Sequence, residues 1–96
     1  MSPLISIVMA TYNGEKYLRE QVDSLLAQSY PSLEFIFVDD ASSDGSHVIL
    51  QQYASQDERI HLVANPINQG LLATFETGIR AAKGELIALS DHLVLV

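Results

Sequence analysis

A chain of 96 residues is long enough for one small domain, and its hydrophobic content of 48% supports a packed core and excludes a disordered chain. Its formal net charge is −7, and its 5 lysines and arginines form no basic stripe, which excludes unaided binding to a nucleic-acid backbone. The absence of cysteine excludes disulfides and thiolate metal sites and fits a cytoplasmic protein.

The first half of the chain alternates apolar runs with amphipathic segments. A short β-branched run predicts a buried strand at residues 4–10. A polar loop follows, and its Asn13 is expected to cap the helix that apolar residues at helical spacing predict at about 15–28. A turn containing proline ends that helix, and the next apolar run predicts a strand at 33–38.

The second half repeats this alternation. The polar loop at 39–46 leads into a helix predicted at about 47–54, and a third strand follows at 60–64. A loop rich in turn residues precedes the third helix, which is predicted at about 71–82 and ends on a lysine and a glycine. The last apolar run predicts a fourth strand at 86–89.

This order indicates an α/β fold in which about four parallel strands form one sheet with helices on both faces. Ligands of such Rossmann-like sheets bind outside the carboxyl ends of the strands, so the function is expected at that edge. The polar segments expected to converge there are residues 11–14, 39–46, 65–70 and the chain from Ser90 onward.

The acidic pair Asp39 and Asp40 directly follows the second predicted strand. A carboxylate at that position can accept a hydrogen bond from a base or a ribose, but it can also cap a helix or lie in a solvated loop. Asp44 and Ser46 can cap the second helix equally well, so capping does not require the pair. The residues by themselves leave ligand contact and a structural role both open.

Two further residues follow predicted strands. Tyr12 is either an ordinary half-buried aromatic or a stacking platform for a nucleobase, since every base has a π-face. Asp91 is either a cap or a ligand of a hard cation, Mg²⁺ or Mn²⁺, whose shell phosphate oxygens would complete. His47 and His61 have no metal-ligand spacing, and no glycine-rich dinucleotide or triphosphate motif is present.

Five stretches in the right order and spacing make the chain up to Asp91 resemble the N-terminal half of a family 2 glycosyltransferase with the GT-A fold. They are SIVMATYNG at 6–14, QSYP at 28–31, FVDDASSDGS at 37–46, NQG at 68–70 and AKGELIALSD at 82–91. The residues at 74–76 together with 87–91 look most like the rhamnosyltransferase-like branch of that family.

The resemblance implies transfer of a sugar from a nucleoside diphosphate donor, a UDP- or dTDP-sugar, to an acceptor hydroxyl, usually with inversion. It assigns Thr11 and Tyr12 to the nucleoside pocket, with the aromatic ring against the base. The residue matching Asp40 would bond the pyrimidine ring, which leaves Asp39 a structural role. Asp44 and Ser90 would belong to the same nucleotide pocket.

The resemblance also implies a metal site. The residue matching Asp91 opens the Asp-x-Asp element of the family, which contacts the ribose and holds Mg²⁺ or Mn²⁺ on the diphosphate. That cation would stabilise the charge of the leaving group. The second acid of the element is replaced by Leu93 here, and residues 92–96 depart from the family as a divergent tail.

The catalytic base and the acceptor-binding half lie further along in the family, so the catalytic residues are expected beyond the end of this chain. Truncation, with foreign residues at 92–96, explains this better than a degenerate gene product, and the chain alone is expected to be inactive. The expected partners are the nucleoside diphosphate sugar and an acceptor glycan or lipid-linked sugar, with self-association through surface that truncation exposes. The location implied is cytoplasmic or peripheral to the inner face of the membrane.

An alternative from another class is a signalling or binding module with a receiver-like acidic pair. In such a module the acidic pair follows the first strand, whereas Asp39 and Asp40 follow the second strand here.

Overall fold

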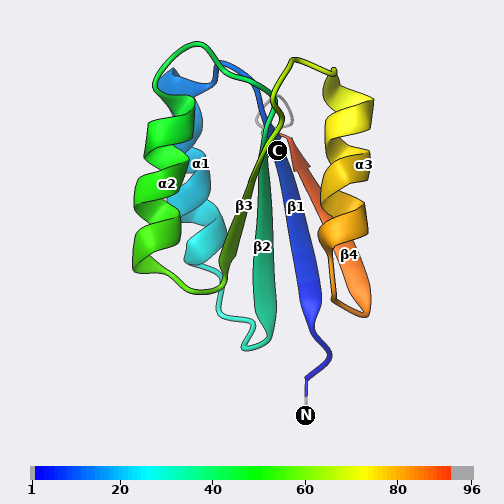
Figure 1. Ribbon diagram of the computed structural model, residues 1–96. Helices are drawn as coiled ribbons and strands as arrows, with labels where there is room; N and C mark the ends of the chain where they lie inside the picture. Colours follow the sequence, from blue (N-terminus) through cyan, green and yellow to red (C-terminus); the bar gives the residue numbers. More distant parts are fainter. Residues whose placement is uncertain (1, 92–96) are drawn as a thin grey trace.

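The computed structural model describes residues 2–91, and its seven elements are arranged as one sheet with helices on both sides (Figure 1). The predicted tail at 92–96 lies outside these residues. All seven elements occur in the predicted order, with bounds that differ from the predicted ones by at most two residues. In chain order they are β1 (Ile5–Thr11), α1 (Glu15–Leu26), β2 (Leu33–Asp39), α2 (Ser46–Gln56), β3 (Ile60–Ala64), α3 (Leu71–Ala81) and β4 (Leu86–Asp91).

The four strands are all parallel and lie in the order β3-β2-β1-β4. The first three strands therefore lie side by side in chain order, and β4 lies on the other side of β1. Helices α1 and α2 cover one face, and α3 crosses the other (Figure 1). The strand order reverses between β1 and β4, and in open parallel sheets the crevice at such a reversal is where ligands bind.

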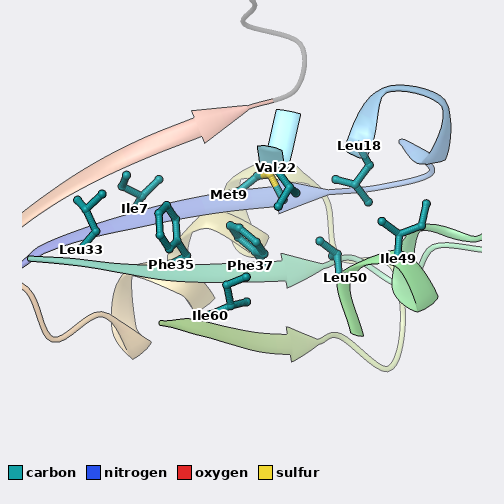
Figure 2. Packing of buried hydrophobic residues seen from close by; sticks show 10 residues of the cluster. All are labelled: Ile7, Met9, Leu18, Val22, Leu33, Phe35, Phe37, Ile49, Leu50 and Ile60. Atoms are coloured by element: carbon teal, nitrogen blue, oxygen red, sulfur yellow. The ribbon is translucent and has the colours of Figure 1, made fainter. Parts of the chain in front are cut away.

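The larger core fills the space between the sheet and the helix pair α1 and α2. Figure 2 shows Phe35 and Phe37 of β2 beside Ile7 and Met9 of β1, with Leu18 of α1 nearby. The ring centroids of the two phenylalanines lie 5.9 Å apart in a tilted arrangement, which aromatic pairs favour. Every residue of β2 is buried, so the acidic loop that follows this strand starts from the interior of the molecule.

A smaller core lies under α3. Val8, Ile36 and Val38 point to this face, and Phe75 of α3 packs against them. Gly78 is the position where the helix comes closest to β1, because a Cβ atom added there would lie 2.3 Å from Val8 Cγ1. A glycine at this position thus lets α3 pack closely against the sheet.

Strand β4 is far more open than the other strands. Leu86, Ile87 and Leu89 are 60%, 42% and 56% exposed, whereas the apolar residues of β1 and β2, except Ile5 at the start of β1, are buried. Among residues 2–91, none of the helices is both long enough and apolar enough to span a bilayer.

Candidate functional site at the carboxyl ends of the strands

The carboxyl ends of all four strands are level with one another. Thr11 of β1 pairs with Asp39 of β2, Asp39 pairs with Ala64 of β3, and on the other side of β1 Ala10 pairs with Asp91 of β4. The polar loops therefore leave the sheet at one edge, as the sequence predicts (Figure 1). Two backbone bonds extend the ladder past the strands, from Asp40 N to Thr11 O at 2.8 Å and from Asn65 N to Asp39 O at 2.9 Å.

The loop after β1 and the acidic loop after β2 are joined by reciprocal hydrogen bonds. Asn13 N donates to Ser42 Oγ at 2.9 Å, and Asn13 Oδ1 accepts from Ser43 N at 2.8 Å. The expected N-cap at Asn13 is therefore wrong: the N-cap of α1 is Gly14, and the Asn13 side chain bonds the other loop instead. Asn13 and Ala41 both have positive φ, 49° and 59°, an uncommon conformation outside glycine that turns the two loops toward each other.

The same exchange continues at the first turns of α1 and α2. Asp44 Oδ2 accepts from Glu15 N at 3.2 Å, and Asp44 Oδ1 accepts from Ser46 N at 2.9 Å. In return, Gly14 N donates to Ser46 Oγ at 3.0 Å and Gly45 N donates to Glu15 Oε1 at 2.8 Å. The N–H groups at each helix start thus find side-chain acceptors, and three of these four hydrogen bonds join the two segments to each other.

The N-cap of α2 is Gly45, so neither Asp44 nor Ser46 is the cap residue that the sequence suggested, but the Asp44 carboxylate accepts a hydrogen bond from the first backbone N–H of each helix. Burial acts to raise the pKa of Asp44, but the hydrogen bonds from Ser46 and from the backbone of Glu15 outweigh it and hold the pKa below its usual value. The exposed carboxylate is therefore ionised at neutral pH, beside the positive ends of two helix dipoles.

The two members of the acidic pair point to different partners. Asp39 Oδ2 accepts from Ser42 N at 3.3 Å, its Oδ1 accepts from the Ser42 hydroxyl, and His47 Nδ1 lies 3.6 Å from Asp39 Oδ2. Asp39 thus shapes its own loop, in agreement with the structural role expected for it.

Asp40 is 3% exposed and its carboxylate holds the loop between β3 and α3. Its Oδ1 accepts from Asn65 Nδ2 at 2.9 Å and from Gln69 N at 2.7 Å. Its Oδ2 accepts from Asn68 Nδ2 at 2.9 Å and from Gly70 N at 2.9 Å. Burial acts to raise the pKa of Asp40, but these hydrogen bonds, led by that from Asn65, lower it below the usual value, so the group is ionised.

The remaining predicted residues lie at the reversal between β1 and β4. Thr11 is buried, and its hydroxyl has no hydrogen-bond partner among residues 2–91. Tyr12 follows it and is 47% exposed, so its ring is accessible at this edge. Ser90 Oγ accepts from Gln21 Nε2 at 3.3 Å, and Asp91 ends β4 in register with Ala10.

Sequence reasoning missed several residues that shape this edge. Gln21, on the sheet-facing side of α1, is buried and ties that helix to the end of β4. Asn65 and Thr74 are also buried and bonded to each other at 3.2 Å. Gln21 and Thr74 are polar residues among apolar ones on the inner face of a helix. This pattern in the sequence could have identified both of them, but not Asn65.

The metal ligand predicted from the sequence is Asp91, whose side chain lies outside the part of the chain that the structure describes. Among the side chains of residues 2–90, no three His, Asp or Glu come together as a metal site. A carboxylate is the kind of ligand that Mg²⁺ takes together with substrate phosphates, so the type of residue at this position fits the predicted cation.

Comparisons with known proteins agree on one family. The family model described as Glycosyl transferase family 2 matches residues 6–92. The chain is 42% identical over 89 residues to TuaG of Bacillus subtilis, named as a teichuronic acid biosynthesis glycosyltransferase, covering 93% of this chain and 35% of that protein. It is 41% identical over 91 residues to the glycosyltransferase GlyG of Streptococcus pneumoniae, covering 95% of this chain and 30% of that protein. The chain thus spans about a third of the length of these relatives.

Two solved structures share the fold closely. The mannosyltransferase PcManGT from Pyrobaculum calidifontis, in complex with GDP-Man and Mn²⁺, superposes with a TM-score of 0.87 at 28% identity over 95% of this chain and 28% of that one. TarS 1–349 of S. aureus in complex with UDP superposes with a TM-score of 0.84 at 28% identity over 92% of this chain and 27% of that one. The GT-A architecture expected from the sequence is therefore confirmed.

Proposed function

Because the chain belongs to the family 2 glycosyltransferases, we propose that it forms the nucleotide-sugar-binding part of an enzyme that transfers a sugar from a UDP- or dTDP-sugar to an acceptor hydroxyl with inversion. The observation that carries the proposal is the edge at which the Thr11 and Asp40 loops are locked together, beside the strand reversal between β1 and β4. A rigid, acidic edge of this kind suits a neutral base and a metal-bound diphosphate.

The predicted site residues would have different roles in the pocket. The exposed ring of Tyr12 is the surface on which a base would stack. Thr11, the residue before it, is buried with its hydroxyl unpaired among the described residues, and it would line the same pocket. Asp40 and Asp44 would serve the base end of the pocket through the loops they hold. Ser90 would serve its other end, at the end of β4.

Asp91 is the residue that would hold Mg²⁺ or Mn²⁺. When bound, the cation would neutralise charge on the departing diphosphate. The solved relative with GDP-Man and Mn²⁺ supports divalent metal use in the family. The catalytic base is proposed to lie beyond this chain, since the curated relatives that match it are about three times as long.

The acceptor would be a glycan or a lipid-linked sugar, and the teichuronic acid name of the relative TuaG supports this class. A rhamnosyl donor stays a prediction, which rests on the resemblance of residues 74–76 and 87–91 to one branch of the family. Two of these residues have packing roles, because Thr74 is buried and Phe75 packs against the smaller core. Self-association stays a prediction supported by the exposed apolar side chains of β4, and sedimentation would test it. A cytoplasmic location at the inner face of the membrane is likewise proposed. No observation favours the receiver-like alternative.

Calorimetric titration of the folded chain with UDP and dTDP tests the proposal. We expect weak, saturable binding that Mn²⁺ strengthens, and an Asp91→Asn variant that keeps the metal-free binding but loses the gain from Mn²⁺. A folded sample that binds neither nucleotide at millimolar concentration would overturn the proposal. Equal gains from Mn²⁺ in the wild type and the variant would overturn the role of Asp91.

A further inference from the structure

Asn13 is followed by Gly14, and this is the only Asn-Gly pair in the sequence. In such a pair the backbone nitrogen of the glycine can attack the side-chain carbonyl carbon of the asparagine, because glycine has no Cβ atom to block the approach. Of the other two asparagines, Asn65 precedes a proline, whose nitrogen carries no hydrogen, and Asn68 precedes a bulkier glutamine. The sequence therefore contains one favoured site for this reaction.

The reaction changes residue 13 without an enzyme or a cofactor. A bond forms between Gly14 N and Asn13 Cγ, the bond from Cγ to Nδ2 breaks, and Nδ2 leaves as ammonia with the proton that Gly14 N gives up. Water then opens the resulting cyclic imide at either of its carbonyl groups. One opening gives aspartate, and the other gives isoaspartate, in which the backbone runs through the former side chain.

The side-chain carbonyl of Asn13 is prepared for such an attack. Asn13 is exposed, and its Oδ1 accepts hydrogen bonds from Ser43 N at 2.8 Å, from the Ser43 hydroxyl at 3.4 Å and from Asp44 N at 3.4 Å. Negative charge develops on this oxygen when a nucleophile adds to Cγ, and donors aimed at the oxygen stabilise that charge. The loop at 42–46 therefore favours the reaction at the carbonyl.

The attacking nitrogen, in contrast, is engaged elsewhere. Gly14 is buried, and its N–H donates to Ser46 Oγ at 3.0 Å, in a residue that is 0% exposed. The backbone on either side is also held, since Asn13 N donates to Ser42 Oγ at 2.9 Å and Gly14 O accepts from Tyr17 N at 3.0 Å. Gly14 N can therefore turn toward Asn13 Cγ only after its hydrogen bond to Ser46 breaks.

We propose that Asn13–Gly14 is a site of spontaneous deamidation, and that the hydrogen bond from Gly14 N to Ser46 Oγ controls its rate. In the closed arrangement the carbonyl is activated but the nucleophile is restrained, so the folded chain reacts slowly. Local opening of the two loops releases the nucleophile. The isoaspartate product adds a carbon atom to the backbone directly after Tyr12, which breaks the exchange between the loops permanently. The inference does not depend on the proposed function.

The rate at which the amide at residue 13 becomes an acid tests the proposal. The chain is kept in mildly alkaline buffer, with and without urea, and peptide mapping with mass spectrometry locates the change and separates aspartate from isoaspartate. Folded wild type is expected to react several-fold more slowly than the chain in urea. Ser46→Ala, which releases Gly14 N, is expected to react roughly two- to tenfold faster than wild type when folded, the effect of one net hydrogen bond.

Two control variants and a second measurement separate this role from a general loss of stability. Ser55→Ala makes the same change on the exposed surface of the same helix and should leave the rate unchanged. Glu34→Gln, which alters buried hydrogen bonds near the opposite end of β2, should also leave the rate close to that of wild type. Hydrogen exchange at Gly14 N, followed by NMR, should rise in Ser46→Ala together with the deamidation rate.

A slow folded wild type together with a faster Ser46→Ala supports the proposal. Equal rates for the folded chain and the chain in urea overturn it, as do equal rates for Ser46→Ala and wild type. Acceleration of Glu34→Gln by as much as Ser46→Ala also overturns it, because the reaction would then follow global unfolding. A chain that forms no acid at residue 13 even in urea removes the site itself. If Ser46→Ala does not fold, the comparison of folded and unfolded wild type decides.

Discussion

Glu15 and Gly45 are joined across 30 residues by a hydrogen bond from Gly45 N to Glu15 Oε1 at 2.8 Å. The bond belongs to the reciprocal exchange that holds the first turns of α1 and α2 together. The first residue of each helix therefore supplies a side-chain acceptor to the N-cap of the other: Glu15 Oε1 to Gly45 N and Ser46 Oγ to Gly14 N.

Glu15→Ala is expected to lower the free energy of unfolding by about 0.5–1.5 kcal/mol, the usual net contribution of one hydrogen bond. Glu20→Ala, on the exposed surface of the same helix, is the control and should change stability by less than about 0.5 kcal/mol. Urea denaturation of both variants measures the difference. Equal stabilities of the two variants would show that the exchange does not stabilise the fold.

Gly78→Ala is expected to destabilise the fold although alanine favours a helix. The added Cβ would lie 2.3 Å from Val8 Cγ1, and overpacking of this kind costs about 1–3 kcal/mol, which exceeds the gain of about 1 kcal/mol in helix propensity. Thermal unfolding of Gly78→Ala, Val8→Ala and the double variant tests the contact. The double variant should be more stable than the sum of the single changes predicts; strict additivity would contradict the contact.

The stability of the fold should depend on the ionisation of Asp40. Hydrogen bonds hold its pKa in the folded chain below the value of about 3.9 that an aspartate has when unfolded. Its stabilising contribution is therefore complete above about pH 4 and is lost as the pH falls through the folded pKa. Asp40→Asn should lower the unfolding free energy at pH 7 by about 1.5–3 kcal/mol and flatten its decline below pH 4. An unchanged acid slope in urea titrations would refute this role.

Glu34 is a second buried carboxylate and serves as the comparison. It lies near the opposite end of β2, where it accepts hydrogen bonds from Ser6 Oγ and from Lys83 N. Burial acts to raise its pKa, and these bonds lower it below its usual value. Glu34→Gln should therefore also flatten the acid decline in stability but leave UDP affinity unchanged. Loss of affinity in this variant would indicate that stability alone controls binding.

Tyr12 should act through its ring. Tyr12→Ala is expected to weaken UDP binding by about 1–3 kcal/mol, the range for stacking of one base on an aromatic side chain, while Tyr12→Phe keeps most of the affinity. Calorimetry on both variants makes the comparison. Equal losses in the two variants would point to the hydroxyl instead, and no loss in either would remove Tyr12 from the site.

The sequence by itself determined the order and type of the elements, the edge where the polar loops meet and the family. These depend on local periodicity, on turn residues and on motifs such as FVDDASSDGS, all of which can be read along a short stretch. The structural role expected for Asp39 also followed, since its main partner, Ser42, is three residues away.

Only the tertiary structure decided which groups the loops bond. Asn13 bonds a loop 30 residues away rather than the helix beside it, and the donors to Asp40 come from 25 to 30 residues further along the chain. Several donors and acceptors compete for each loop residue, and local sequence cannot rank them. The donors to Asp40 come within hydrogen-bonding distance only when α3 packs on the sheet, where Gly78 lies against Val8. The different partners of Asp39 and Asp40 therefore follow from the tertiary structure.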